Sequence, residues 1–248
     1  MTLFRPPPHR HSLESPEFPT TQRRTKFPTI YQCHTLDREK QTVVSGLNGT
    51  LLRSRSSFPY FMLLAFESPL GCLRFLILLL LSPLVWLLDT CVSEAASLRI
   101  LVFVACAGAR VADIRSAAQA VLPKFYVQDV HPEAWRVFSA FGRRYVLTSS
   151  PRLMVEPFAL QYLGADGVIG TELHILSGFG QQRASGFVLP SRCMVGEGKA
   201  IGFRRYFSDS SRGAAHEHTM VDVHVGLGNG SNDHPFLSLC KVYMIGFH

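Results

Sequence analysis

The amino-acid sequence predicts an α/β protein built around a parallel sheet, and three observations carry that prediction. Short apolar runs with strand character recur along the chain, at residues 43–44, 144–148 and 168–170. Segments with apolar residues at helical spacing lie between the later runs, and strands that alternate with helices favour a parallel sheet. Residues 68–88 carry one charged side chain, Arg74, and predict an apolar helical insertion between the first two strands.

The remaining elements follow in order after this insertion. We expect a helix at 132–141, a strand that ends at 148, a helix at 152–163, a parallel strand at 168–170 and a β-hairpin at 173–189. In open parallel sheets the ligand site lies at the carboxyl ends of the strands. Gly46, Thr148 and Asn229 are all expected at that edge.

Composition limits the classes of partner. The 248 residues are 47% hydrophobic and 17% charged, with a formal net charge of +7. A positive charge favours anionic partners, and because no nucleic-acid motif accompanies it, membrane lipid is favoured and nucleic acid is not expected. The six cysteines form no C-x-x-C pair, which favours reduced thiols in a protein that faces the cytosol.

Four segments are predicted. Residues 1–26 are basic and rich in proline, with little to bury, and predict a disordered tail. Residues 27–57 hold the first strand and the loop after it. Residues 58–112 form the apolar, membrane-associated helical insertion, and residues 113–248 form the remainder of the α/β domain.

The insertion contains two apolar runs of different length. As a helix, residues 68–88 would extend about 32 Å, enough to cross a hydrocarbon core. Residues 100–109 would extend about 15 Å, which is too short to cross alone. Two interpretations remain open: a hairpin or re-entrant insertion in which the second run returns the chain, or a pair of buried core helices.

The pairing of strands restricts the first interpretation. The strand before Gly46 and the strand that ends at Thr148 must lie in one sheet, and both apolar runs lie between them. One crossing would place these strands on opposite sides of the bilayer. The insertion therefore crosses an even number of times or not at all.

The loop after the first strand, SGLNGTLL at 45–52, has the frame of a known catalytic loop. It resembles the D-x-D-G-T-L-L loop of haloacid-dehalogenase-type (HAD) phosphatases, in which one aspartate attacks phosphorus and the second transfers a proton. Gly46 and Asn48 occupy those two positions, and neither can perform the step. Glycine also leaves residue 46 free to adopt a positive φ. The alternative is an ordinary Asn-Gly turn.

Three later positions match the same pattern in the expected order. Thr148 ends a strand, Lys199 follows a turn, and a glycine-rich loop contains Asn229 and Asp233. The resemblance implies that Thr148 and Lys199 hold phosphate.

The resemblance also implies that Mg²⁺ would take oxygens from the positions of Gly46, Asn229 and Asp233 and from the carbonyl of Asn48. Asp233 alone keeps a carboxylate, and Mg²⁺ prefers anionic oxygen. We therefore expect a vestigial metal site and no cofactor.

Longer blocks resemble a particular family. They are RSRSSFPYFM at 53–62, AVLPKFY at 120–126, HPEAWRVF at 131–138, PRLMVEPF at 151–158 and GTEL at 170–173. Over residues 27–243 the chain resembles the N-terminal, HAD-like half of the plant sn-2 glycerol-3-phosphate acyltransferases. The resemblance implies a membrane enzyme of cutin or suberin synthesis, at the endoplasmic reticulum with this half facing the cytosol.

Acyltransferases of this kind use a His-x₄-Asp motif, and no histidine here is followed by aspartate at that spacing. The acyltransferase half is thus expected to be absent from this sequence, and the leading interpretation is an inactive scaffold. The alternatives are an active phosphatase on lysophosphatidate and a non-catalytic module that binds phosphate esters or a partner. A separate cluster, His216, His218, Asp222 and His224, favours a polar insertion loop over a transition-metal site.

Overall fold

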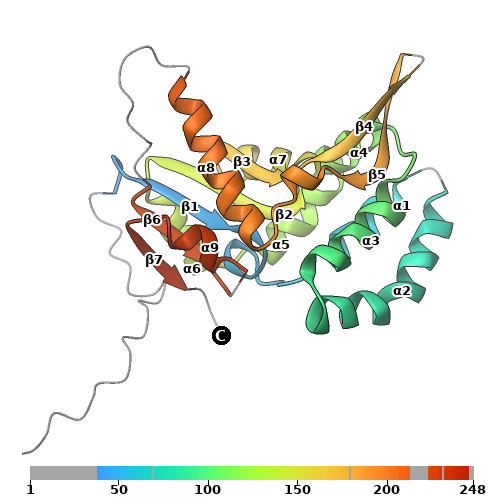
Figure 1. Ribbon diagram of the computed structural model, residues 1–248, viewed down its shortest axis with the longest axis horizontal. Helices are drawn as coiled ribbons and strands as arrows, with labels where there is room; N and C mark the ends of the chain where they lie inside the picture. The colour runs from blue at the N-terminus through green and yellow to red at the C-terminus, as the bar shows by residue number, and fades with distance from the viewer. Residues whose placement is uncertain (1–37, 69, 179, 213–222, 231, 246–248) are drawn as a thin grey trace, which may run out of the picture.

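The structure is a computed structural model that describes residues 38–68, 70–178, 180–212, 223–230 and 232–245. Its centre is a five-stranded sheet in which all neighbouring strands run parallel (Figure 1). The strand order is β3-β2-β1-β6-β7. The bounds are β1 Thr42–Gly46, β2 Arg143–Pro151, β3 Gly167–Thr171, β6 Val225–Gly228 and β7 Val242–Ile245. The predicted α/β class with a parallel sheet is confirmed, while the predicted tail at 1–26 lies outside the described residues.

Helices cover both faces of this sheet, and for that reason its strands are continuous apolar runs. In β1, Val43 belongs to one apolar cluster and Val44 to another, on the opposite face. The helices that contribute to the cluster of Val43 include α4 Val111–Ala120, α5 Leu122–Asp129, α6 Pro132–Ser139 and α7 Arg152–Gln161. Two helices contribute to the cluster of Val44: α8 Glu197–Arg212 and α9 His234–Leu237.

The predicted hairpin forms a separate two-stranded antiparallel sheet, β4 Leu173–Gly178 and β5 Gln181–Val188. It joins the end of the insertion through backbone hydrogen bonds. The amide of Gly108 donates to the carbonyl of Ala184 at 2.8 Å, and the amide of Ala184 donates to the carbonyl of Ala109 at 2.9 Å. The hairpin and the insertion therefore form one continuous side of the molecule.

The insertion between β1 and β2 begins with three helices, α1 Phe58–Phe66, α2 Gly71–Cys91 and α3 Glu94–Cys106. Figure 1 shows them together at one end of the molecule, with α2 along the outside. The side chain of Ser93 caps α3 by accepting from the amide of Ala95 at 3.1 Å, a common way to begin a helix.

Helix α3 is a core helix. Its residues Leu98, Leu101, Val102 and Ala105 are 0–3% exposed and belong to the same apolar cluster as Val43. This burial argues against the expectation that residues 100–109 return the chain through a bilayer. The helix begins earlier than predicted, at Glu94, and one side of it packs on protein, while Arg99 and Phe103 on its other side are exposed.

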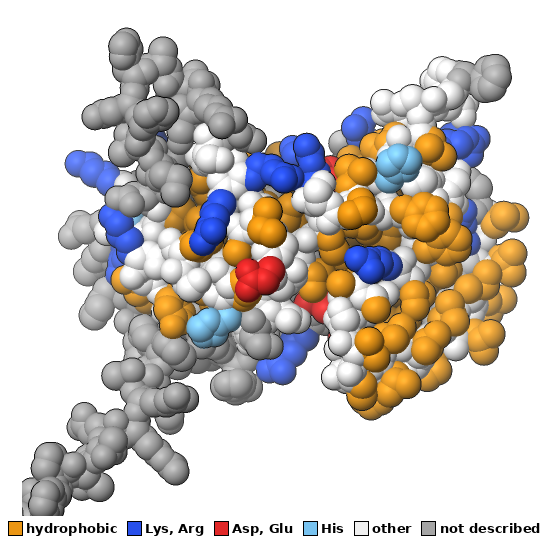
Figure 2. Space-filling model, viewed as in Figure 1, with side chains coloured by type: hydrophobic (Ala, Val, Ile, Leu, Met, Phe, Trp, Pro, Cys, Tyr) orange, Lys and Arg blue, Asp and Glu red, His pale blue; other side chains and the backbone are white. Residues whose placement is uncertain are grey.

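Helix α2 differs from α3 in its burial. Leu78 and Val85 are its buried residues, whereas Leu80 is 80% exposed. Within the described residues, α2 is the one helix long and apolar enough to cross a membrane by length and composition. The interpretation as buried core helices thus holds for α3 and fails for α2. Figure 2 shows the resulting surface, an apolar area over the end of the molecule that α2 forms.

Candidate functional site

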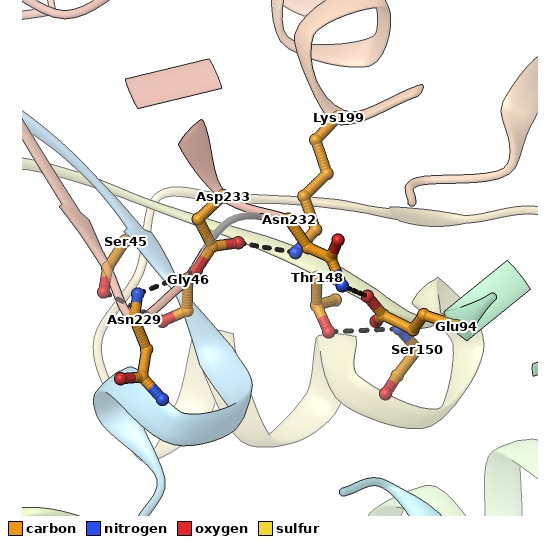
Figure 3. A network of polar contacts seen from close by, with 9 residues as sticks. All are labelled: Ser45, Gly46, Glu94, Thr148, Ser150, Lys199, Asn229, Asn232 and Asp233. Atoms are coloured by element: carbon orange, nitrogen blue, oxygen red, sulfur yellow. Dashed lines mark hydrogen bonds and ion pairs between the residues drawn. The ribbon is translucent and has the colours of Figure 1, made fainter. Parts of the chain in front are cut away.

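The candidate site is a cavity of about 240 Å³ at the carboxyl edge of the sheet, where β1, β2 and β6 end. Most of its lining is polar. It brings together five of the residues that the sequence singled out: Asn48, Thr148, Lys199, Asn229 and Asp233. Gly46, the sixth, lies directly beside them (Figure 3).

Gly46 ends β1 at the position where a HAD phosphatase carries its nucleophile. Its backbone has φ −59° and ψ 152°, which any residue can adopt, so the expected freedom toward positive φ is not used. A Cβ built on Gly46 would lie 3.1 Å from both Asp233 Oδ2 and Thr50 Oγ1. An aspartate here would therefore be directed at Asp233, and both neighbours would have to move by a few tenths of an ångström.

The next loop residues turn the chain away from the sheet. Asn48 is extended, with φ −67° and ψ 130°, and Gly49 has φ 69°, a left-handed conformation that favours glycine. The amide of Gly49 donates to the carbonyl of Ser54 at 2.8 Å, which closes the loop. The Asn-Gly turn and the phosphatase-like position are therefore two descriptions of one loop.

Lys199 and Asp233 form a buried ion pair. Lys199, in the first turn of α8, donates from Nζ to Asp233 Oδ1 at 2.6 Å, and both side chains are 8% exposed. The second carboxylate oxygen of Asp233 accepts from the amide of Asn229 at 2.9 Å. Both oxygens of this carboxylate are thus already engaged (Figure 3).

Thr148 is buried in β2, and its hydroxyl accepts from the amide of Ser150 at 3.2 Å. The strand continues to Pro151, beyond its predicted end at Thr148. Thr148 and Ser149 both line the cavity. One hydroxyl proton of Thr148 therefore remains for a bound ligand.

Two acidic residues that sequence reasoning missed come from the insertion. Asp89, near the end of α2, and Glu94, at the start of α3, both line the cavity. Glu94 accepts from the side-chain amide of Asn232 at 2.5 Å, which joins the insertion to the last loop of the sheet. Burial, and then the nearby Glu94, raise the pKa of Asp89. These two carboxylates reach the cavity because of how the insertion packs, and no sequence motif predicts their position there.

The residues present do not fit the Mg²⁺ site of HAD phosphatases. Position 46 offers no side-chain oxygen, and the Lys199 ammonium already neutralises the Asp233 carboxylate. Among the described residues no group of three or more His, Cys, Asp or Glu side chains could hold a metal ion. The residues at this edge therefore do not support a Mg²⁺-dependent reaction.

Of the predicted histidine cluster, the structure describes His224. His216, His218 and Asp222 lie outside the described residues. His224 precedes β6, and its Nδ1 accepts from the amide of Thr42 at 3.3 Å. This contact aligns the starts of two strands, which is a structural role.

A parallel sheet of this order, with helices inserted after its first strand and a polar cavity at its carboxyl edge, defines a HAD-like α/β domain. This one lacks the two loop carboxylates that HAD phosphatases use. Residues 42–245 match the family model described as "Glycerol-3-phosphate acyltransferase RAM2-like, HAD-like domain". The chain belongs to this family, and the predicted resemblance is confirmed.

Individual relatives agree with the family match. Glycerol-3-phosphate acyltransferase RAM2 of Petunia hybrida is 49% identical over 195 residues, which cover 79% of this chain and 38% of that protein. Glycerol-3-phosphate acyltransferase 1 of Arabidopsis thaliana is 32% identical over 83% of this chain and 34% of its own length. The chain thus spans well under half of these curated relatives.

Among solved structures, the chain is similar to a protein of unknown function from Bordetella pertussis Tohama I. The TM-score is 0.63, and the match covers 83% of this chain and 89% of that one. Since the two sequences are 14% identical, this likeness shows the fold alone.

The Lys199–Asp233 pair predicts a measurable coupling in stability. Lys199→Met leaves the Asp233 carboxylate buried without its cation and should lower the free energy of unfolding by about 3 kcal/mol. Adding Asp233→Asn removes the uncompensated charge, so the double variant should lose less than the sum of the singles, by about 1–3 kcal/mol. Urea unfolding of the four proteins at pH 7 measures this.

The matched control is Lys124→Met, at an exposed lysine on α5, which should change the free energy of unfolding by less than about 0.5 kcal/mol. Strict additivity in the double variant would contradict the ion pair.

Proposed function

We propose that this chain is the phosphatase-like part of a glycerol-3-phosphate acyltransferase and that it does not hydrolyse phosphate esters. The proposal includes a role in cutin or suberin lipid synthesis, at the cytosolic face of the endoplasmic reticulum. The relatives named glycerol-3-phosphate acyltransferase and the exposed apolar helix α2 support a membrane-associated protein of lipid synthesis.

One observation carries the proposal: the cavity gathers Thr148, Lys199 and Asp233 at the carboxyl edge of the sheet, while positions 46 and 48 carry no carboxylate. Hydrolysis by the HAD route needs a carboxylate oxygen to attack phosphorus and an acid to protonate the leaving oxygen. Gly46 has no side chain, and the amide of Asn48 does not donate a proton to an alkoxide near neutral pH. This argues against the alternative of a working phosphatase on lysophosphatidate.

A second candidate function, binding without hydrolysis, is favoured by buried acceptors in the loops. Among the described residues, Asn48 Oδ1, Asn229 Oδ1 and Thr50 Oγ1 are buried and have no hydrogen-bond partner. An unpaired buried acceptor costs about 1–3 kcal/mol, so a ligand that donates there would bind favourably. A polyol phosphate offers hydroxyl donors to such acceptors and a phosphate to Lys199 and Arg55, both of which line the cavity.

Negatively charged side chains in the cavity limit its affinity for such an anionic ligand. Asp233 already neutralises Lys199, and the carboxylates of Asp89 and Glu94 line the same cavity. The raised pKa of Asp89 reduces this repulsion, because it favours the neutral acid. We therefore expect weak binding, with a dissociation constant of about 1 mM.

The purified chain should show no Mg²⁺-dependent phosphatase activity, because nothing at positions 46 and 48 can attack phosphorus or protonate the leaving group. The measurement is release of phosphate from lysophosphatidate and of nitrophenol from p-nitrophenyl phosphate, at pH 7 with Mg²⁺. Thr148→Ala serves as the matched control. Turnover above that control would contradict the proposal.

Glycerol 3-phosphate should bind to the chain unchanged, and more tightly than inorganic phosphate, because its hydroxyls donate to the buried amide oxygens. Isothermal calorimetry with both compounds measures the difference, and the recovered ligand is checked for hydrolysis. Arg55→Ala should weaken binding several-fold, whereas the exposed Arg205→Ala should not. Equal affinity for glycerol 3-phosphate and inorganic phosphate would show that the buried amide oxygens do not contribute to binding.

Restoring the lost carboxylates should restore chemistry, since the scaffold still gathers the other positions. The triple variant Gly46→Asp, Asn48→Asp, Asn229→Asp should hydrolyse p-nitrophenyl phosphate with Mg²⁺, while each single variant stays near background, because a catalytic set acts as a unit. Mg²⁺ at 100 times its dissociation constant should also stabilise the triple variant by about 2.7 kcal/mol. A folded triple variant with neither response would show that these residues do not share one site.

A further inference from the structure

Helix α2 presents a continuous apolar surface. Leu73, Leu80 and Leu87 are spaced by seven residues, close to two helical turns, and are 54%, 80% and 48% exposed. Leu76, Ile77, Leu84 and Trp86 are also exposed on this helix. Figure 2 shows a broad apolar area over the end of the molecule that α2 forms. Such an area on a described surface marks an interaction site.

The first end of α2 is fixed to the folded body. Arg74 extends its guanidinium to the last turn of α3, where it donates to the carbonyls of Ala105 at 2.8 Å and Ala107 at 2.5 Å. A cation at the end of a helix is favourable, because the free carbonyls there carry partial negative charge. Arg74 is thus a bridge between the two helices, and its charge is directed at the carbonyls of α3.

The second end of α2 is fixed to the same body. Asp89 lines the polar cavity, and two residues after α2 Ser93 caps α3. Glu94 then reaches Asn232 in the loop after β6. Along its length α2 packs on α3 through Leu78 and Val85, and α3 is buried in the core.

These contacts exclude a crossing by α2. Since α3 is a core helix, it cannot return the chain through a bilayer, so a crossing by α2 would be a single one. A single crossing would separate β1 from β2, which are paired in register from Thr42↔Arg143 to Gly46↔Leu147. Both ends of α2 must therefore lie on the side of the sheet.

The surroundings of α2 favour lipid as the occupant. Phe103 of α3 and Phe187 of β5 are 49% and 62% exposed, lie 5.7 Å apart between ring centroids, and extend the apolar area beyond α2. An apolar cleft of about 510 Å³ is lined by Leu81 of α2 together with Phe103 and Phe187. The exposed Arg99 lines this cleft and adds a positive charge to its rim. Aliphatic and aromatic side chains beside arginine suit acyl chains and anionic headgroups.

We propose that α2 lies parallel to the membrane plane in one leaflet, with Leu73, Leu80 and Leu87 in the acyl chains and both of its ends on the same side. This inference rests on the membrane association in the proposed function and not on the chemistry of the cavity. Because Asp89 lines the cavity, this geometry holds the candidate site next to the lipid headgroups.

Depth-dependent quenching tests the geometry. In the full chain with Trp86→Phe and Trp135→Phe, single reporters Leu73→Trp, Leu80→Trp and Leu87→Trp are bound to phosphatidylcholine–phosphatidylserine vesicles that carry bromine at a shallow or a deep acyl position. A helix in the plane should give three equal quenching profiles. A crossing helix would place Leu80→Trp about 10 Å deeper than the other two. Leu160→Trp, on the exposed side of α7, is the matched control and should not be quenched.

Vesicle flotation tests the partner. Leu73→Glu with Leu80→Glu should weaken binding at least about tenfold per residue, and Leu160→Glu should leave it unchanged. A graded depth profile would overturn the in-plane geometry and leave the non-hydrolysing cavity untouched. Absence of vesicle binding, including the case in which the chain is a dimer that protects this face, would overturn both the inference and the membrane part of the proposed function.

Discussion

The parallel pairing of β1 with β2 is the constraint on which the rest of the structure depends. The two strands align residue by residue from Thr42 to Gly46, although nearly a hundred residues separate them. The segment inserted between them leaves the sheet at the carboxyl end of β1 and returns at the amino end of β2. Both ends of the insertion must therefore lie on the same side of a bilayer. The same pairing brings Gly46 and Thr148 to one edge, so the position of the cavity and the limit on membrane topology have a common cause.

At the carboxyl edge of the sheet, the charged side chains pair differently from those of a HAD phosphatase. In a HAD phosphatase a lysine would face a nucleophilic aspartate and a metal. Here the nucleophile position is Gly46, and Lys199 pairs instead with Asp233, the remaining acid of the last loop. A buried carboxylate without a cation is strongly destabilising, so each residue of this pair stabilises the other in a cavity without the reacting groups. The amide oxygens of Asn48 and Asn229 then remain as acceptors, which favours binding over hydrolysis.

The helical insertion connects this edge to the apolar surface. Glu94 and Asp89 stand at the cavity, while the same two helices carry the contact with Arg74 and the exposed leucines of α2. Because α3 lines the cavity and also packs in the core cluster that includes Leu78 and Val85 of α2, it connects the cavity to the apolar surface of α2. A ligand that arrives from a membrane surface would meet the cavity without a domain movement.

The sequence alone determined the class of fold, several of its elements from residue 132 to 189 and the place of the site, because apolar periodicity and strand-end chemistry are local properties. The loop at Gly46 and Asn48 revealed the missing carboxylates for the same reason. The tertiary structure alone decided what depends on packing between distant segments. It buried α3 and left α2 outside, although both are apolar, because burial depends on neighbours and not on composition. It also paired Lys199 with Asp233 and brought Asp89 and Glu94 to the cavity, contacts that no spacing along the chain encodes.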